Sequence, residues 1–187
     1  VFKDFRVIET GIKHGTVTVL IDNEPLEITT YRSESTYSDN RHPDSVVFSK
    51  TLKDDVVRRD FTMNAIAFDF QEGFVDLVGG TNDINNRLIR CIGDAETRFR
   101  EDALRILRAL RFSAVLGFSI EENTSLAIHK CKDLLKNISA ERIQVEFSKL
   151  ICGKNAYNVL QEYEDVVCVF IPEIKNSVDF EQINRHH

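Results

Sequence analysis

The sequence lacks every long apolar run. No hydrophobic stretch approaches the ~20 residues that a helix needs to cross a bilayer, and no export signal is visible. The four cysteines form no C-x-x-C pair, which argues against a zinc finger or a disulfide framework. The five histidines likewise form no ligand cluster. These absences favour a cytoplasmic protein with reduced thiols and no membrane anchor.

Positive charge is also in short supply. The 187 residues carry 24 Lys and Arg against 30 Asp and Glu, a net charge of −6, which argues against a generally basic surface for nucleic acid. The imbalance is uneven, however, because residues 98–111 hold five arginines and two acids. Residues 154–187 hold two lysines and one arginine against six acids. A site for an anion is therefore expected to be local.

The first half of the chain predicts strands. Residues 16–22 and 25–32 are rich in β-forming residues and are joined by a turn at 22–25, so they predict a hairpin. Residues 33–45 are polar and predict a loop. A short helix is expected over 61–67, followed by a short strand over 73–76. The chain opens at Val1 on the approach to a strand, so we expect it to begin inside a domain.

The second half predicts helices. Apolar periodicity indicates helices over 97–116, 121–136 and 139 to about 152, with Ser139 as N-cap and Gly153 as the stop. A chain of 187 residues with 42% hydrophobic residues can bury one or two cores. The fold class we predict is α+β, with a mixed first part followed by an all-α part.

One helical segment carries a stripe of charge. In REDALRILRALRF (100–112), Asp102, Arg105, Arg108 and Arg111 recur at steps of three and predict a ridge on a continuous helix. One interpretation is a solvated charged face with an ordinary Glu101–Arg105 pair. The other is a site for an anionic ligand, because Arg111 lies at the flank of the leucine side, where a guanidinium must snorkel or find an anion.

Three stretches together resemble a known family. RRDFTMNAIAFD (58–69), GFVDLVGGTNDINNRLIRCIG (73–93) and REDALRILRALRF occur in an order and spacing similar to bacterial tRNA nucleotidyltransferases, the CCA-adding enzymes, and the related poly(A) polymerases. The resemblance covers about residues 7–153. It implies a partial nucleotidyltransferase head (1–79), a hinge and helical neck that recognises the nucleotide (80–153), and the start of a helical body (154–187).

The resemblance also implies a metal site that this sequence does not contain. In the family, a D-x-D strand after a G-G-x-x-R-D turn holds two Mg²⁺ ions, and neither pattern occurs here. The expected Mg²⁺ ligands would then lie upstream of Val1, and the chain by itself is expected to be inactive. Glu27 aligns with a strand carboxylate that supports the metals, although a surface acid is the alternative.

Base recognition is assigned by the resemblance to Asp102 and Arg105. Cytosine and adenine share an amino donor beside a ring-nitrogen acceptor, which an acid and an arginine complement. Uracil and guanine invert both positions, at a cost of about 1–3 kcal/mol for each mismatched group. The resemblance therefore implies CTP and ATP as substrates, and the tRNA 3′ end as acceptor.

Other residues follow from the same motifs. Arg108 and Arg111 resemble contacts to the nucleotide, and a guanidinium suits its phosphates. Arg59 is the family's further nucleotide contact, and Asn64 resembles the residue beside the ribose. The alternative for the neighbouring Arg58 and Asp60 is a salt bridge that holds the helix to the sheet.

A glycine pair resembles the family's hinge between head and neck. The motif consists of Asp76, Gly79, Gly80 and Asp83, and its glycines permit backbone changes during domain closure; a plain turn is the alternative. The tail DFEQINRHH resembles the entry into an HD-type domain, or else is a truncation. Poly(A) extension, a non-catalytic nucleotide- or RNA-binding module and a purely structural helical domain stay open as other functions.

Overall fold

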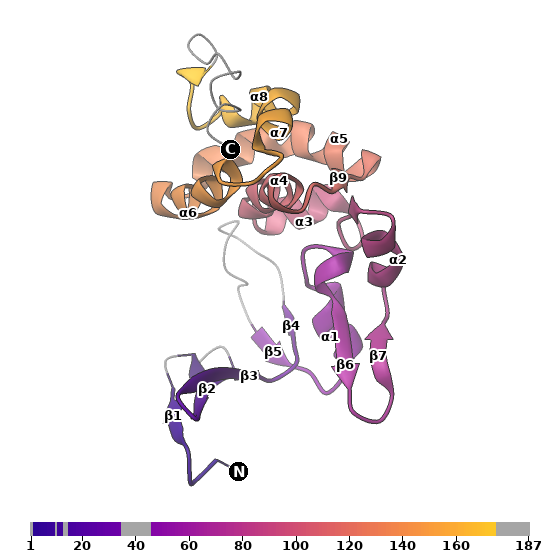
Figure 1. Ribbon diagram of the computed structural model, residues 1–187, viewed down its shortest axis with the longest axis vertical. Helices are drawn as coiled ribbons and strands as arrows, with labels where there is room; N and C mark the ends of the chain where they lie inside the picture. The colour runs from indigo at the N-terminus through magenta and orange to yellow at the C-terminus, as the bar shows by residue number, and fades with distance from the viewer. Residues whose placement is uncertain (1, 10, 13–14, 35–45, 175–187) are drawn as a thin grey trace. The chain divides into compact units, whose positions relative to one another are not determined.

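The computed structural model describes residues 2–9, 11–12, 15–34 and 46–174 (Figure 1). These residues divide into two compact units, one up to residue 58 and the other from residue 59 onward. The first contains mostly strands and the second mostly helices, so the predicted α+β class is confirmed.

The first unit is built on a three-stranded antiparallel sheet in the order β1-β2-β3. Its strands are β1 (Arg6–Ile8), β2 (Thr16–Ile21) and β3 (Glu24–Thr29). The turn between β2 and β3 places Asp22 and Asn23 at φ 50° and 68°, the left-handed pair of a two-residue hairpin turn. The predicted hairpin is therefore confirmed, although its second strand ends at Thr29.

The loop predicted over 33–45 is wrong at its start. Strand β4 (Arg32–Glu34) pairs antiparallel with β5 (Val46–Phe48), so Ser33 and Glu34 belong to a strand. Backbone pairing with a distant segment decides this, and the polar side chains gave no sign of it. Residues 35–45 lie outside the described part. Helix α1 (Leu52–Val57) follows, capped by Thr51, whose hydroxyl accepts the Asp54 N–H at 3.3 Å.

The second unit opens with a turn rather than the predicted helix over 61–67. A single 3₁₀ turn, η2 (Thr62–Asn64), leads into β6 (Ile66–Asp69), which pairs antiparallel with β7 (Gly73–Asp76). The helix prediction is wrong because residues 66–69 form a strand that pairs with β7 in a hairpin. The predicted strand over 73–76 is confirmed. Helix α2 (Gly80–Asn85) and the short strand β8 (Leu88–Ile89) complete this part.

The predicted helix over 97–116 is two helices, α3 (Ala95–Glu101) and α4 (Leu104–Leu116). Between them Asp102 is extended, with φ −143° and ψ 103°, and its carboxylate accepts the Leu104 N–H at 3.1 Å. An Asp side chain that bonds the backbone competes with helix continuation, which explains the break. The prediction that all four charged residues lie on one continuous helix is therefore wrong for Asp102, which lies between α3 and α4.

The other helical predictions are confirmed with changed ends. After β9 (Ser119–Ile120), α5 (Glu122–Cys131) passes into the 3₁₀ turn η3 (Lys132–Asn137). Helix α6 (Ala140–Ile151) begins after Ser139, whose side chain makes no capping hydrogen bond. Two short helices follow, α7 (Ala156–Glu162) and α8 (Glu164–Val167). None of the helices in the described ranges is long and apolar enough to span a membrane.

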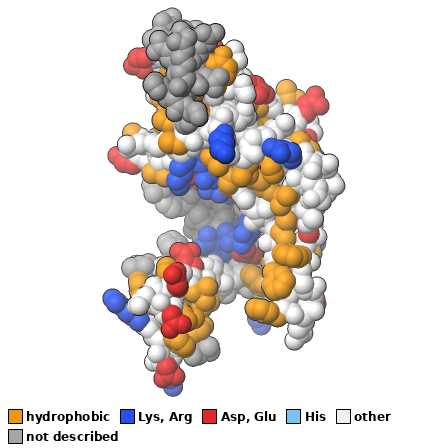
Figure 2. Space-filling view, viewed as in Figure 1, with side chains coloured by type: hydrophobic (Ala, Val, Ile, Leu, Met, Phe, Trp, Pro, Cys, Tyr) orange, Lys and Arg blue, Asp and Glu red, His pale blue; other side chains and the backbone are white. Residues whose placement is uncertain are grey.

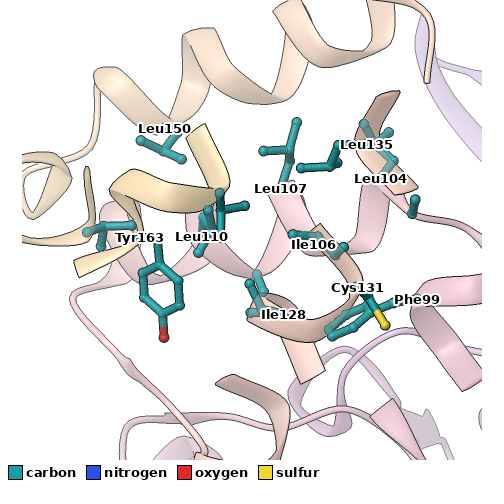
Figure 3. Packing of buried hydrophobic residues seen from close by; sticks show 14 of the residues in the cluster. Phe99, Leu104, Ile106, Leu107, Leu110, Ile128, Cys131, Leu135, Leu150 and Tyr163 are labelled. Carbon is teal, nitrogen blue, oxygen red and sulfur yellow. The ribbon is translucent and has the colours of Figure 1, made fainter. Parts of the chain in front are cut away.

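The core of the second unit surrounds α4. Figure 3 shows Ile106, Leu107 and Leu110 of α4 among Leu150 of α6 and Ile128 of α5, and all five are fully buried. The turn after α6 approaches α4 so closely that a Cβ on Gly153 would lie 2.5 Å from the Ala114 carbonyl carbon. A side chain at this position would clash with the α4 backbone, so glycine allows the turn after α6 to pack directly against α4.

Candidate functional site

The candidate site is a cluster of charges on the second unit where α4 meets α6. Arginines of α4 pair with acids from three different segments, and Figure 2 shows Lys and Arg side chains gathered near these helices.

Arg105 forms the predicted pair with Glu101. Its Nη1 lies 2.7 Å from Glu101 Oε2 and also donates to the Arg98 carbonyl at 3.1 Å. The side chain of Arg105 is only 11% exposed. The i,i+4 pair is therefore confirmed, whereas a solvated charged face is the wrong description of this arginine.

Asp102 projects from the break between α3 and α4. Its carboxylate is held by Arg142 of α6, whose Nη2 lies 3.0 Å from Oδ2 and 3.2 Å from Oδ1. The charged groups of Asp102 and Arg105 thus bond to different partners in this ligand-free structure. Their joint role in reading a base stays a prediction.

Arg108 connects α4 to the RRD segment. Its Nη2 and Nε lie 2.6 and 2.8 Å from Asp60 Oδ2. Asp60, only 8% exposed, uses its other oxygen to accept the Phe61 N–H and the Asn64 side-chain amide. Arg58 pairs with Asp55 of α1. Both Arg58 and Asp60 therefore form salt bridges, Arg58 with Asp55 of α1 and Asp60 with Arg108 of α4.

Arg111 finds an anion within the chain. Its Nε lies 2.8 Å from Glu146 Oε2, and its guanidinium stacks over the Phe112 ring at 4.0 Å. Burial lowers the pKa of Arg111, and the nearby Glu146 carboxylate partly opposes that shift. Glu146 is only 6% exposed and also lies 3.9 Å from Arg108 Nη1.

Arg59 and Asn64 lie together beside this cluster. Arg59 Nη1 donates to the Asn64 carbonyl at 3.0 Å, and the Asn64 side chain reaches Asp60 at 3.1 Å. The structure thus links two predicted residues from the RRD motif to Arg108 through one shared carboxylate. Asp60 and Arg108, which form this link, are 48 residues apart in the sequence.

Two members were missed by the sequence analysis. Arg142 and Glu146 lie four residues apart on α6 and face the α3–α4 break and α4. Their i,i+4 spacing was a usable signal, because residues four apart share a helix face. The sequence does not show, however, that α6 packs beside α4, so the partners of these two side chains could not be predicted from it.

The predicted hinge motif is tightly bonded in this structure. Asp76 accepts the N–H groups of Val78, Gly80 and Thr81 at 3.2, 2.9 and 2.8 Å. Asp83, 3% exposed, accepts the Thr62 hydroxyl at 2.7 Å and Arg90 Nε at 3.1 Å.

The two glycines of the motif have different roles. Gly79 has φ 78°, the left-handed region, and a Cβ there would meet nothing within 4 Å. A Cβ on Gly80 would lie 2.2 Å from the Thr62 carbonyl oxygen. Gly79 therefore allows the left-handed backbone conformation, and Gly80 allows α2 to approach the Thr62 carbonyl closely. A hinge motion there stays a prediction.

The bonds to Asp76 predict acid-sensitive stability. Burial acts to raise the pKa of Asp76, but hydrogen bonds from Thr81, Gly80 and Val78 outweigh it and lower the pKa to about 2. Because the folded pKa lies below that of the unfolded chain, the stabilisation is complete above about pH 5, decreases below that, and is lost as the pH falls through about 2. For this partly exposed carboxylate we expect at most about 1 kcal/mol.

The measurement is the free energy of unfolding against pH for the wild type and Asp76→Asn. The difference between them should be constant above about pH 5 and shrink as the pH falls toward about 2. Glu141→Gln, which changes an exposed acid in the first turn of α6, is the control. A difference that is unchanged at the acid end would contradict this account of Asp76.

Glu27 lies apart from any acidic cluster that the structure describes. It is exposed on β3, where its Cα pairs with that of Thr18 on β2. Among the described residues, no group of three or more His, Cys, Asp and Glu side chains is placed to hold a metal ion. The donor set of the described residues therefore does not fit a two-Mg²⁺ centre, and no chemical step is assigned to a metal here.

A separate cavity of about 450 Å³ lies between the β8–α3 connection and α5. Its lining includes Arg90, Asp94, Glu121 and Lys130. Arg90 is paired with Asp83 and Glu121, and Lys130 with Glu96. None of the predicted nucleotide-binding residues lines this cavity, so it is not the candidate site.

Comparison with known proteins identifies two family models that match separate parts of the chain. Residues 2–90 match the family model described as the poly A polymerase head domain. Residues 117–175 match the model described as a probable RNA and SrmB-binding site of polymerase A. A CCA-adding enzyme of Lactobacillus helveticus is 51% identical over 160 residues, which are 86% of this chain and 40% of that relative.

Solved structures agree with these matches. A crystal structure of the Bacillus stearothermophilus CCA-adding enzyme in complex with CTP has a TM-score of 0.76 at 43% identity, covering 84% of this chain and 38% of that one. A tRNA nucleotidyltransferase complexed with a primer tRNA and an incoming ATP analog has a TM-score of 0.68 at 27% identity, covering 94% of this chain and 47% of that one.

The fold is that of a nucleotidyltransferase head and helical neck. The chain belongs to the family of tRNA nucleotidyltransferases and poly(A) polymerases, as the sequence motifs indicated. It spans about 40% of the length of the curated relatives that it matches.

Proposed function

We propose that the intact protein is a CCA-adding enzyme, which transfers C and A from CTP and ATP to tRNA 3′ ends without a nucleic-acid template. This chain would carry the part that recognises the nucleotide. The observation that carries the proposal is the placement of Asp102 outside the helices, next to an arginine-rich face of α4. Relatives named CCA-adding enzyme, at about half identity over most of the chain, support it.

In the proposed mechanism, Asp102 and Arg105 read the pairing edge of the base. Asp102 would accept a hydrogen bond from the amino group of cytosine or adenine, and Arg105 would donate to the adjacent ring nitrogen. Each carboxylate oxygen has two lone pairs, so Asp102 retains acceptor capacity beside Arg142. Arg105 would have to turn part of its guanidinium from Glu101 toward the base.

The remaining predicted residues would hold the sugar and phosphates. We propose that Arg108 and Arg111 contribute positive potential toward the triphosphate, which their pairing with Asp60 and Glu146 reduces but does not abolish. Arg59 is proposed as a further nucleotide contact, and Asn64 as the residue beside the ribose. Their mutual hydrogen bond and the link through Asp60 keep both near Arg108.

We keep the proposed domain limits at 1–79, 80–153 and 154–187, with Asp76, Gly79, Gly80 and Asp83 as the hinge. We also propose a cytoplasmic location, which suits the four free cysteines.

Phosphoryl transfer in this family is proposed to need a divalent metal, Mg²⁺, which would stabilise charge on the transferred phosphate. Its ligands are not among the described residues, and Glu27 is proposed only as a supporting carboxylate.

The test is nucleotide incorporation by the intact protein into tRNA that lacks its CCA end. We expect addition of two C residues and one A, with UTP and GTP used at least about tenfold less efficiently. Long runs of A would favour a poly(A) polymerase instead, the alternative that the matched head-domain model keeps open. Failure to bind CTP or ATP at all would contradict both.

A further inference from the structure

The hairpin of β6 and β7 carries a cluster of exposed aromatic rings. Phe68, Phe70 and Phe74 are 59%, 97% and 79% exposed, and we call these three residues the aromatic face. The Phe68 ring lies edge-on to both others, with ring centroids 5.6 Å from Phe70 and 5.3 Å from Phe74. Figure 2 shows hydrophobic side chains gathered over this hairpin, at the lower right of the view.

The aromatic face is presented by an ordered turn. Phe68 and Phe74 are directly opposite each other in the antiparallel register, so their side chains lie on the same side of the hairpin. The turn that carries Phe70 is held by Asp69, whose carboxylate accepts two backbone N–H groups at 2.7 and 3.0 Å. A partner would therefore lose little free energy in ordering this segment.

The size of the aromatic face indicates that another segment covers it. With roughly 200 Å² for each phenylalanine, the three side chains expose on the order of 450 Å². An apolar patch of that size is among the largest that monomers expose, and such patches are often binding sites. A two-stranded hairpin is also marginally stable by itself, and an apolar sheet face is usually packed against a helix or a second sheet.

The charge around the aromatic face determines what can cover it. Residues 66–76 contain Asp69, Glu72 and Asp76, and no lysine or arginine occurs between residues 60 and 86. Although bases can stack on aromatic rings, these acids would repel the phosphates of RNA. The complementary surface is therefore apolar at its centre and basic at its edge, as in a polypeptide with Lys and Arg beside apolar residues.

A second copy of this chain is a poor match for the aromatic face. A symmetric contact would bring the same acids of both copies together, and their like charges would repel. The aromatic face also supplies little more than half of the roughly 800 Å² that each partner buries in a stable complex. The small area fits a transient contact with a different protein.

We propose that the aromatic face docks a basic amphipathic helix of a partner protein. The apolar side of that helix would cover Phe68, Phe70 and Phe74, and its Lys and Arg side chains would lie against Asp69 and Glu72. None of the residues proposed to bind the nucleotide lies within 66–76. The contact thus goes beyond the proposed function and does not depend on it.

The test uses the intact protein and a fluorescent peptide of about 18 residues, with Leu and Lys in the pattern of an amphipathic helix. Fluorescence anisotropy should show binding with a Kd of about 1–100 μM that weakens as salt is added. Phe70→Ser removes the most exposed ring and should weaken binding at least about tenfold. Glu72→Lys reverses a charge beside the rings and should weaken it about threefold or more.

The controls separate this contact from general adhesion. Leu126→Ser removes an apolar side chain that is 62% exposed on α5, and should leave the Kd within about twofold of the wild type. A peptide with Glu in place of every Lys should not bind. Thermal unfolding and CCA addition should both be unchanged in Phe70→Ser. Failure of the proposed function would appear separately, as a wild type that does not add CCA.

Several results would overturn the inference. The first is no binding of the Leu and Lys peptide, or equal binding of the peptide with Glu. The second is an equal loss of binding in Leu126→Ser and Phe70→Ser. If Phe70→Ser weakens tRNA binding and not peptide binding, the aromatic face stacks on bases instead. If it abolishes a dimer of the wild type in sedimentation velocity, the occupant is a second copy.

Discussion

Asp102→Ala should remove most of the discrimination between CTP and UTP in the intact protein. Without the carboxylate, nothing in the proposed reader accepts the amino group of cytosine, and nothing opposes the carbonyl oxygen that uracil places there. We expect the ratio of kcat/KM values to fall by about 10- to 100-fold, the range for one buried polar mismatch. Steady-state incorporation with each nucleotide measures that ratio.

A matched control for Asp102→Ala is Glu141→Ala. Glu141 is an exposed acid in the first turn of α6, next in sequence to the arginine that holds Asp102. Its removal changes the net charge by the same amount and should leave the CTP preference within about twofold of the wild type. An equal loss in both variants would mean that net charge, and not the carboxylate of Asp102, decides selectivity.

Gly80→Ala should be among the most destabilising single-methyl additions in the second unit. The new Cβ would lie 2.2 Å from the Thr62 carbonyl oxygen, so backbone atoms must move and the bond from Thr62 to Asp83 would be strained. We expect a loss of about 3 kcal/mol, at the upper end for overpacking. For a chain of this size, Tm should fall by roughly 6–12 °C in thermal unfolding.

The neighbouring Gly79→Ala provides the comparison. Its Cβ meets nothing, so only the left-handed backbone conformation opposes the substitution, at about 1 kcal/mol. A Gly80→Ala variant no less stable than Gly79→Ala would show that this contact yields easily. The motif would then be freer to act as a hinge than its bonding suggests.

The position of the charged stripe could be predicted from the sequence because it is local. Spacing by three placed Arg105, Arg108 and Arg111 on one helix, and α4 contains all three. The Glu101–Arg105 pair, at 2.7 Å, was also expected from its spacing of four residues, although it spans the break between α3 and α4.

Longer-range features were not predictable in this way. The break at Asp102 depends on a carboxylate that bonds a backbone N–H and an arginine 40 residues later, and the surrounding residues are good helix formers. Asp60 and Glu146 as counter-ions likewise depend on which segments pack beside α4. Strand β4 was missed for a similar reason, since its partner β5 is not adjacent in sequence.

The most direct measurement is a crystal structure of the intact protein with CTP bound. The account predicts a carboxylate oxygen of Asp102 about 2.9 Å from the cytosine amino nitrogen, with Arg105 bonded to the ring nitrogen. It also predicts that Arg142 stays on Asp102 while the phosphates lie toward Arg108 and Arg111. A cytosine bound away from Asp102, with Asp102 and Arg105 still held only by Arg142 and Glu101, would contradict it.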